Sequence, residues 1–327
     1  MGNVKVSVLV PAYNVERYVR QCLESLAAQT YDNFEVVCLN DGSTDLTGDI
    51  LHDFAENDAR FRVVDKPNSG YGATMNRGIA ESTGDFIAIL ESDDFAEPHM
   101  LETLARPARR RGVELVKANY YEYYDEQDHL LVNFRRLMCG RKFDPATKPE
   151  VIRSIPAIWT GLYSRRMIER ENIRFRETPG ASFQDTAFTL KCWFAARGCV
   201  LVRKPVMHYR MDNPQSSVKT NDKVFAVCDE LADAEAFLRE RPERLEAFIG
   251  QFHADKLGKC RWDYERLSPE HKVEFATRMR DEYRQANAAG ELWHELYDAA
   301  QWKRLFELMA ADDVAAFTAA HPKSLDE

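Results

Sequence analysis

The sequence has no long run of apolar residues. Its longest strongly apolar stretches, residues 6–10 and 86–90, have the length of β-strands, whereas a helix that crosses a membrane needs about 20 apolar residues. The residues before the first of these stretches also lack the apolar core of a secretion signal. We therefore expect a cytoplasmic chain without a transmembrane helix.

Cysteine is scarce and scattered. The seven cysteines are never spaced as Cys-x-x-Cys, and several lie in apolar runs, where cysteine serves as a small core residue. A zinc cluster needs closely spaced pairs and a disulfide framework needs an oxidising compartment, so we expect neither. The cysteines are Cys22, Cys38, Cys139, Cys192, Cys199, Cys228 and Cys260.

An excess of positive charge is also missing. The chain has 44 Lys and Arg against 53 Asp and Glu, which gives a formal net charge of -9. A surface that binds nucleic acid is normally basic, so we expect no nucleic-acid partner. The basic run from Arg109 to Arg111 is either a solvated helix end or a point of peripheral membrane contact, and the sequence leaves both open.

The first part of the chain alternates between two hydrophobic periods. Val6, Val8 and Val10 lie in a continuous apolar run, which predicts a buried parallel strand, and residues 15–28 place apolar side chains on one helical face. Repeated strand–helix units predict an α/β fold with a mainly parallel sheet and helices on both faces. Further strands are expected at 34–39, 62–64, 85–90 and 114–118, and further helices at 46–54 and 73–82.

The pattern changes twice along the chain. From about residue 119 it becomes less regular, through a Tyr-rich stretch at 120–124 and polar loops, and after about residue 220 it becomes helical. We therefore expect an α/β region over residues 1–220, divided near residue 118, and a helical region over residues 221–327.

Ligands bind beyond the carboxyl ends of the strands in such sheets, so the residues after the strands matter most. PAYN follows the first strand at 11–14, NDGS follows the second at 40–43, and ESDD follows the fourth at 91–94. Acidic residues this close together repel one another unless a cation lies among them, and Mg²⁺ or Mn²⁺ prefers oxygen ligands. The alternative is a turn that caps the helix near Pro98, and spacing alone leaves both open.

Several ordered motifs resemble those of one enzyme family. They are VLVPAYN at 8–14, NDGSTD at 40–45, NSG at 68–70 with NRG at 76–78, and ESD at 91–93. Over residues 4–217 the chain resembles the inverting glycosyltransferases of family 2. The resemblance implies the GT-A fold over residues 1–220, with a nucleotide-sugar-binding half (1–118), an acceptor half (119–220), and a helical C-terminal extension over 221–327.

The resemblance also implies roles for the donor site. Asp41 would contact the nucleotide base, and Tyr13 would pack against that base. Asp93 would hold Mn²⁺ or Mg²⁺, and Glu91 would bind the same metal or the donor ribose. On its chemistry alone, His208 is either a third ligand, because a neutral imidazole can complete an oxygen-rich metal site, or a structural residue. The residues expected to bind the nucleotide-sugar are Pro11, Ala12, Tyr13, Asn14, Asp41, Asn68, Gly70, Asn76, Glu91, Ser92 and Arg210.

Two further residues are assigned to the acceptor side. Asp185 matches the catalytic Asp of the family and would remove the proton of the acceptor hydroxyl; the residues alone also allow it to be a helix N-cap. Trp159 would stack against an acceptor sugar, or would simply be buried. This chain departs from the family pattern at Glu91, where Asp is usual, at Gln184, where Glu is usual, and at Met75, where many members have Arg.

Residues 158–161, 178–185 and 208–210 resemble a bacterial branch that builds capsular or lipopolysaccharide chains. This narrower resemblance implies that a hexose passes from a UDP-sugar to a saccharide or lipid-linked acceptor, at the inner face of the cell membrane if the enzyme is peripheral. The sequence leaves the oligomeric state open, a homo-oligomer included.

Other interpretations also stay open. A sugar nucleotidyltransferase would carry a Gly-rich, basic loop after the first strand, which residues 11–14 do not supply. A non-catalytic nucleotide-sugar-binding module is favoured if Gln184 marks the loss of the base site. An assembly protein would use the apolar residues at 293–309 to pack on a partner. Gly70-x-Gly72 is no dinucleotide fingerprint, because Met75 takes the third glycine position and the motif follows the third strand.

Overall fold

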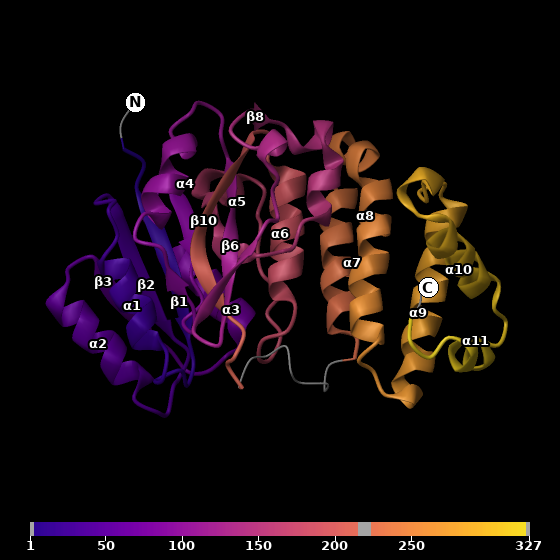
Figure 1. Ribbon diagram of the computed structural model, residues 1–327, viewed down its shortest axis with the longest axis horizontal. Coiled ribbons are helices and arrows are strands. Elements are labelled where there is room, and N and C mark those ends of the chain that lie inside the picture. Colours follow the sequence, from indigo (N-terminus) through magenta and orange to yellow (C-terminus); the bar gives the residue numbers. More distant parts are fainter. Residues whose placement is uncertain (1–2, 215–223, 325–327) are drawn as a thin grey trace. The chain divides into compact units, whose positions relative to one another are not determined.

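The computed structural model describes residues 3–214 and 224–324, and these form two compact units. The first unit comprises Met1–Lys148 and Ser154–Ser216, and the second comprises Pro149–Arg153 and Ser217–Glu327. Figure 1 shows their helices and strands, many of them labelled. The predicted boundary at residue 220 lies outside the described residues.

The first unit is built on a mixed sheet of ten strands, counted over the described residues. Four of them form its parallel part: β1 (Val6–Ala12) lies between β2 (Phe34–Asn40) and β4 (Phe86–Ile89), and β3 (Phe61–Asp65) pairs with β2. All seven residues of β1 are buried, as a parallel strand covered on both faces requires. These strands match the apolar runs of the sequence.

The second half of the sheet mixes directions. β9 (Gly161–Ser164) runs antiparallel to β4 and to β6 (Leu115–Tyr124), while β6 runs parallel to β10 (Cys199–Arg210). The sequence predicted that regular structure would loosen at residue 119. β6 instead continues to Tyr124, because tyrosine favours a half-buried strand. The remaining strands are β5 (Phe95–Ala96) and β8 (Lys142–Phe143) beside β10, and β7 (Gln127–Leu131) beside β6.

Helices cover both faces of the sheet (Figure 1). Val8 and Val10 share a core with α1 (Val19–Ala27) and α4 (Met100–Ala108). Leu9 points to the opposite face, since side chains alternate along a strand, and it meets α3 (Tyr71–Glu81), where a Cβ on Gly78 would lie 3.1 Å from it. Three more helices complete the unit: α2 (Thr47–Asn57), α5 (Arg165–Arg170) and α6 (Gln184–Ala195).

The second unit is helical. Its large buried side chains include Phe248 and Phe252 of α8 and Phe275 of α9. Gly250 lets Trp293 pack against α8, because a Cβ at Gly250 would lie 2.1 Å from the indole. The helices are α7 (Ala226–Arg239), α8 (Pro242–Tyr264), α9 (Pro269–Ala288), α10 (Ala299–Ala310) and α11 (Val314–Ala320). Over residues 3–214 and 224–324, no helix combines the length and the apolar character needed to cross a membrane.

Candidate functional site

The loops that follow β1 and β2 are joined by Asn14. Its side-chain Oδ1 accepts a 2.8 Å hydrogen bond from the Thr44 backbone amide, and its backbone amide donates to Ser43 Oγ at 3.2 Å. Asn14 has a left-handed backbone, with φ of 52°, which Asn tolerates better than most residues. Pro11 and Ala12 are the buried last residues of β1, whereas Tyr13 is 50% exposed and presents its ring to solvent. The predicted nucleotide loop is therefore a fixed turn with one exposed aromatic ring.

Asp41 is buried at the end of β2 and is surrounded by donors. The amides of Ser69 and Gly70 donate to its two carboxylate oxygens at 2.9 and 3.1 Å, and Lys66 Nζ forms an ion pair with it. Lys66 also donates to Thr74 Oγ1 at 3.1 Å. The sequence predicted Asp41 but missed Lys66, which no motif marks. Asn68, also predicted, has an exposed side chain beside these residues.

The glycines at 70 and 72 allow α3 to begin against the segment before Asp185. A Cβ on Gly70 would lie 2.6 Å from the Thr178 carbonyl oxygen, and a Cβ on Gly72 would lie 1.9 Å from that of Arg176. Gly70 also has a φ of +87°, a conformation that favours glycine. The two glycines thus serve a close backbone approach, which agrees with the failure of the dinucleotide fingerprint.

One helical turn after Gly72, Asn76 links α3 to the same segment before Asp185. Its side-chain Nδ2 donates to the Phe175 carbonyl at 3.0 Å and to Glu177 Oε1 at 2.9 Å. Its side-chain Oδ1 accepts from the Phe175 backbone amide at 2.9 Å. The side chain that we predicted to bind the donor therefore links α3 to the loop that precedes Asp185.

Glu91, Asp93 and Asp185 form one electrostatic group. Burial raises the pKa of Glu91 to about 8, the Tyr71 hydroxyl opposes this rise, and Asp93 and Asp185 add to it through their negative charge. Tyr71 donates to Glu91 Oε1 at 2.6 Å. Burial, then Glu91 and Asp185, also raise the pKa of Tyr71 itself. The charge of Asp185 therefore acts on Glu91 of the acidic loop and on Tyr71.

The carboxylates of Asp93 and Asp94, in the rest of the acidic loop, accept hydrogen bonds from uncharged groups. Asp93 Oδ2 accepts a 2.8 Å hydrogen bond from Asn213 Nδ2, and Asp94 Oδ1 accepts one from the Arg210 amide at 2.8 Å. Asp94 Oδ2 is buried and has no hydrogen-bond partner among the described residues. Burial and the charge of Asp93 raise the pKa of Asp94. Ser92 is also buried.

This donor set fits a hard divalent cation. It supplies several carboxylate oxygens, one of them buried without a partner, and such a cation would relieve their mutual repulsion. The alternative of a helix cap is wrong, because α4 begins only at Met100 and has no side-chain cap.

Arg210 supports the acidic loop. Its Nε donates to the Asp93 carbonyl oxygen at 2.8 Å, and its Nη2 donates to Gln21 Oε1 at 2.6 Å. The guanidinium also lies over the rings of Tyr18 and Tyr123, 5.0 and 5.1 Å from their centroids. That it binds phosphate oxygens as well stays a prediction.

The assignment of His208 to the metal is corrected by its contacts. Its Nδ1 lies 2.7 Å from Asp128 Oδ1, and its Nε2 lies 2.8 Å from Glu97 Oε1. The ring is stacked between Phe95 and Tyr121, with centroids 4.3 and 5.0 Å away. Both ring nitrogens are therefore engaged by carboxylates outside the loop at 91–94.

Asp185 lies in the first turn of α6. The N-cap position belongs to Phe183, so the interpretation of Asp185 as the cap is wrong. Its Oδ1 accepts from the Thr186 amide at 2.8 Å. Gln184 shapes the preceding loop, since its Nε2 donates to Thr178 Oγ1 at 2.8 Å and its Oε1 accepts from the Ser182 amide. Gln184 thus has a defined structural role beside the proposed base.

Trp159 stands on a second aromatic ring. It is stacked on Tyr209 with centroids 4.7 Å apart and an interplanar angle of 4°, and it meets the edge of Tyr120 at 6.3 Å. The indole is partly buried, and its Nε1 is buried without a hydrogen-bond partner in the described part of the chain. Trp159 therefore belongs to the rim of the core and keeps part of its surface open.

Lys117, which the sequence did not single out, supports the turn that carries Trp159. This fully buried residue of β6 donates from Nζ to the Ala157 carbonyl and, at 3.1 Å, to the Tyr163 hydroxyl. Tyr163 in turn donates to the Ile158 carbonyl at 2.9 Å. Burial lowers the pKa of Lys117 to about 7, against the opposing effects of Cys192, Cys199 and Asp185.

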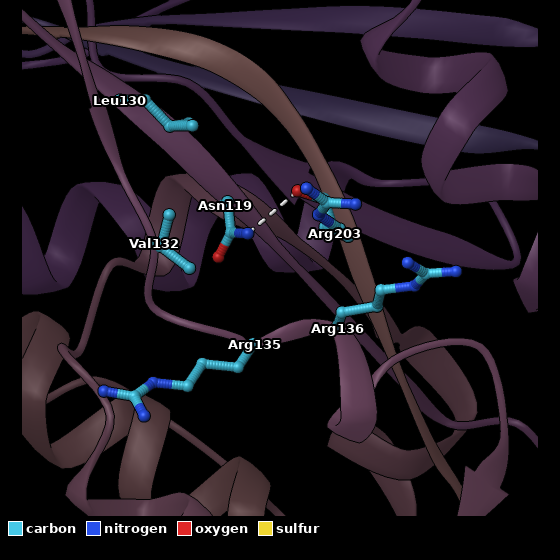
Figure 2. A pocket seen from close by; sticks show the side chains of 6 residues that line it. All are labelled: Asn119, Leu130, Val132, Arg135, Arg136 and Arg203. Atoms are coloured by element: carbon cyan, nitrogen blue, oxygen red, sulfur yellow. Dashed lines mark hydrogen bonds between the residues drawn. The ribbon is translucent and has the colours of Figure 1, made fainter.

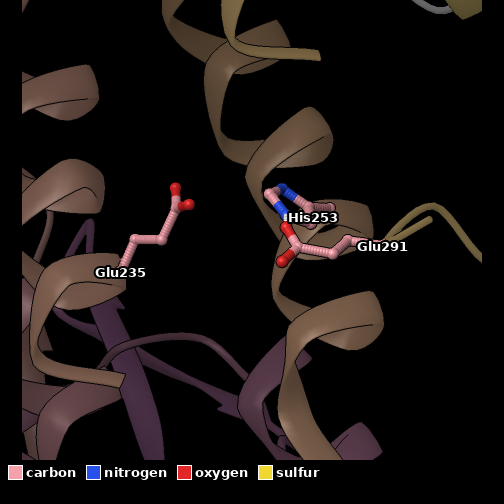
Figure 3. A group of neighbouring side chains, drawn as sticks. All are labelled: Glu235, His253 and Glu291. Atoms are coloured by element: carbon pink, nitrogen blue, oxygen red, sulfur yellow. Dashed lines mark hydrogen bonds and ion pairs between the residues drawn. The ribbon is translucent and has the colours of Figure 1, made fainter. Parts of the chain in front are cut away.

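A second group of His and Glu side chains lies in the helical unit (Figure 3). Glu235 of α7, His253 of α8 and Glu291 after α9 come close together, but Arg239 pairs with Glu235 at 2.7 Å and with Glu291 at 2.8 Å. His253 Nε2 lies 3.1 Å from Glu291. Because the carboxylates already have a cationic partner, this group is an ion-pair network and carries no case for a metal site.

Comparison with known proteins agrees with this geometry. The sequence model described as Glycosyl transferase family 2 matches residues 7–203. EpsH of Bacillus subtilis, named as a glycosyltransferase, is 32% identical over 255 residues, which cover 76% of this chain and 73% of EpsH. Glycosyltransferase GlyA of Streptococcus pneumoniae is 28% identical over 258 residues, 76% of this chain but 36% of GlyA. Chondroitin synthase of Pasteurella multocida is 38% identical over 97 residues, 30% of this chain and 10% of that protein.

Solved structures share the fold. TarS 1-349 of S. aureus in complex with UDP-GlcNAc has a TM-score of 0.60 at 18% identity, over 88% of this chain and 89% of that chain. The mannosyltransferase PcManGT of Pyrobaculum calidifontis, in complex with GDP-Man and Mn²⁺, has a TM-score of 0.56 at 15% identity, over 99% of this chain and 89% of that one. They confirm the predicted fold class, a largely parallel sheet flanked by helices with a helical C-terminal region.

Proposed function

This chain belongs to glycosyl transferase family 2, and from that premise we propose that it transfers a hexose from a UDP-sugar to an acceptor hydroxyl, with inversion, in bacterial surface polysaccharide assembly. One observation carries the proposal. Asp185 shares an electrostatic group with Glu91 and Asp93, although the sequence separates them widely. Tyr71 links the two parts, because its hydroxyl donates to Glu91 and its backbone amide donates to the Gly180 carbonyl, shortly before Asp185, at 3.1 Å. This arrangement supports a proton acceptor beside a set of cation ligands.

Asp185 is proposed as the base. It removes the proton of the acceptor hydroxyl while that oxygen attacks the anomeric carbon, and the bond from this carbon to the nucleoside diphosphate breaks on the opposite face. Glu91 and Asp93 would hold Mn²⁺ or Mg²⁺, and Asp94 would lie close to the cation. When bound, this cation supplies positive charge to the departing diphosphate.

The donor is proposed to bind over β1 and β2. Asp41 already accepts two amide hydrogen bonds, but a carboxylate offers about four lone-pair sites and can accept from a uracil N–H as well. The exposed Tyr13 ring would pack against the base. The likeness to TarS, which was solved with UDP-GlcNAc, supports UDP as the nucleotide, whereas PcManGT was solved with GDP-Man.

The acceptor is proposed to meet Trp159, whose stacking on Tyr209 fixes its ring plane. A saccharide presents an apolar face that suits such a platform. The similarity to a chondroitin synthase supports a growing polysaccharide as the acceptor. If that acceptor is lipid-linked, the reaction takes place at the inner face of the cell membrane.

A thermal-shift panel tests the donor site. UDP, GDP, CMP and NAD are each added with and without Mn²⁺, and the melting temperature is recorded. A ligand that binds only the folded state stabilises it by about 2.7 kcal/mol at 100 times its dissociation constant. A shift with UDP that depends on Mn²⁺ is expected. A shift with GDP alone would indicate a GDP-sugar donor in place of a UDP-sugar. No shift with any nucleotide would contradict the proposal.

A further inference from the structure

A basic and apolar surface lies where β6, β7 and β10 contribute Asn119, Leu130 and Arg203. We define the edge patch by six residues: Leu130, Val132, Arg135, Arg136, Leu137 and Arg203. All but Leu137 line a surface hollow of about 280 Å³, together with Asn119 (Figure 2). Leu137 follows directly in the chain and is 99% exposed, and Leu130 and Val132 are also exposed.

The patch is held in shape by Asn119. This buried amide donates to the Arg203 carbonyl at 2.8 Å and to the Phe134 carbonyl at 3.1 Å, and it accepts from the Phe134 amide at 2.7 Å. Phe134 is itself buried. The buried pair anchors the turn between β7 and β8, so that Arg135 and Arg136 extend outward and away from each other (Figure 2).

The basic run that the sequence singled out adjoins the patch. Arg110 Nη1 donates to the Gly140 carbonyl at 2.7 Å, and Lys142 Nζ donates to the Arg111 carbonyl at 3.2 Å. Both bonds tie the end of the 136–142 segment to residues 109–111. The edge patch therefore continues into a wider cationic surface, although the whole chain has a net charge of -9.

The charges of the patch are not neutralised within the protein. Over residues 3–214 and 224–324, Arg135, Arg136 and Arg203 have no carboxylate within ion-pair distance, in contrast to Arg170, which pairs with Glu114 at 2.6 Å. Their partner is therefore expected to be an external anion.

The exposed aliphatic side chains decide which kind of anion. A soluble anion or a nucleic acid would need the guanidiniums but not Leu130, Val132 and Leu137. A membrane surface rich in anionic phospholipid uses both, since guanidiniums bind phosphates in a bidentate manner and leucines insert at the boundary of headgroups and acyl chains.

We propose that the edge patch docks this protein on anionic phospholipid membranes, with Arg135, Arg136 and Arg203 on lipid phosphates and Leu137 inserted among the headgroups. Arg203 and Arg210 lie in the same strand, so docking would hold the acidic loop on the order of 20 Å along β10 from the lipid surface. The proposal does not depend on the transferase activity.

Vesicle co-sedimentation of the full chain tests the docking. Phosphatidylcholine vesicles are compared with vesicles of phosphatidylcholine and phosphatidylglycerol in equal amounts. We expect about tenfold more protein on the anionic vesicles, and loss of that difference in Arg135→Glu/Arg136→Glu. Lys303→Glu/Lys323→Glu is the matched control, because it changes the charge equally at two exposed lysines elsewhere; equal loss in this control would overturn the proposal.

The apolar contact is tested separately with Leu137. Leu137→Trp should fold normally, because the side chain is fully exposed, and its added fluorescence should shift to the blue on anionic vesicles. Leu137→Ser should weaken vesicle binding while leaving retention on soluble polyphosphate unchanged. An unshifted fluorescence on vesicles that do bind, or equal effects of Leu137→Ser on both ligands, would show a surface for soluble polyanions and overturn the proposal.

Discussion

The Tyr71 hydroxyl donates a 2.6 Å hydrogen bond to Glu91 Oε1. Tyr71 lies in the first turn of α3, which begins against the segment before Asp185, and Glu91 begins the acidic loop after β4. This bond therefore joins the two parts of the candidate site that the sequence presents as separate motifs. It also keeps the buried Glu91 carboxylate from rising further in pKa.

Tyr71→Phe should weaken metal binding. The substitution removes the donor that favours ionised Glu91, so Glu91 would hold its proton more tightly and compete less well for a cation. Loss of a group that orients a metal ligand typically costs 10–100-fold in affinity, so we expect about tenfold weaker Mn²⁺-dependent UDP binding by calorimetry. Tyr124→Phe, at an exposed position, is the control; equal affinities in the two variants would contradict the role of this bond.

Gly72→Ala should disrupt the site through the backbone. A Cβ at this position would lie 1.9 Å from the Arg176 carbonyl oxygen, so the segment leading to Asp185 must move. We expect a clear loss of both melting temperature and sugar transfer. Gly258→Ala in α8 is the matched control, because its Cβ meets nothing within 4 Å and alanine favours a helix. A Gly72→Ala variant as stable and active as the wild type would refute the close approach.

Lys117→Met should change how stability depends on pH. Lys117 has a pKa near 7 when folded and about 10.4 when unfolded, so between these values the unfolded chain binds more protons. The contribution of Lys117 is therefore least favourable below pH 7 and improves as pH rises above it. The stability of the variant relative to the wild type should therefore be highest at about pH 6 and should decrease towards about pH 9. A difference in melting temperature between the two proteins that stays constant over this pH range would argue against a buried, titrating lysine.

His208→Ala should leave the metal dependence of nucleotide binding unchanged. The buried ring is stacked between Phe95 and Tyr121, so the variant should lose packing and stability, by about 0.5–3 kcal/mol. Asp93→Ala should show the reverse, with weaker Mn²⁺-dependent binding. Denaturation and calorimetry on both variants separate the two effects. Metal affinity lost in His208→Ala but kept in Asp93→Ala would restore His208 as a ligand.

Much of the parallel half of the fold was predictable. Continuous apolar runs specify buried parallel strands, and residues just after such strands must gather at one edge, which is why Asp41 and Glu91 could be found from their places in the pattern. Two or three further strands were expected after residue 119, but the position of β9 could not be given, since its four residues are too short a run to establish a period. The extension of β6 was missed because the Tyr-rich stretch at 120–124 has no regular alternation of apolar and polar residues.

The errors at the site have a common cause. His208 follows a strand and has the right chemistry for a metal, but Glu97 and Asp128, which engage its ring, are distant in sequence. Lys66 and Lys117 were missed because a single lysine carries no periodic signal. Their roles arise only when the chain folds and leaves one beside Asp41 and the other inside the sheet.

The most direct test of the central claim is sugar transfer by Asp185→Asn, measured beside its affinity for UDP and Mn²⁺. The substitution keeps the size of the side chain and removes the base. We expect transfer from a UDP-sugar to fall by about 10²–10⁴-fold, while Mn²⁺-dependent UDP binding stays within about threefold of the wild type. Transfer near the wild-type rate would contradict the assignment of Asp185 as the base.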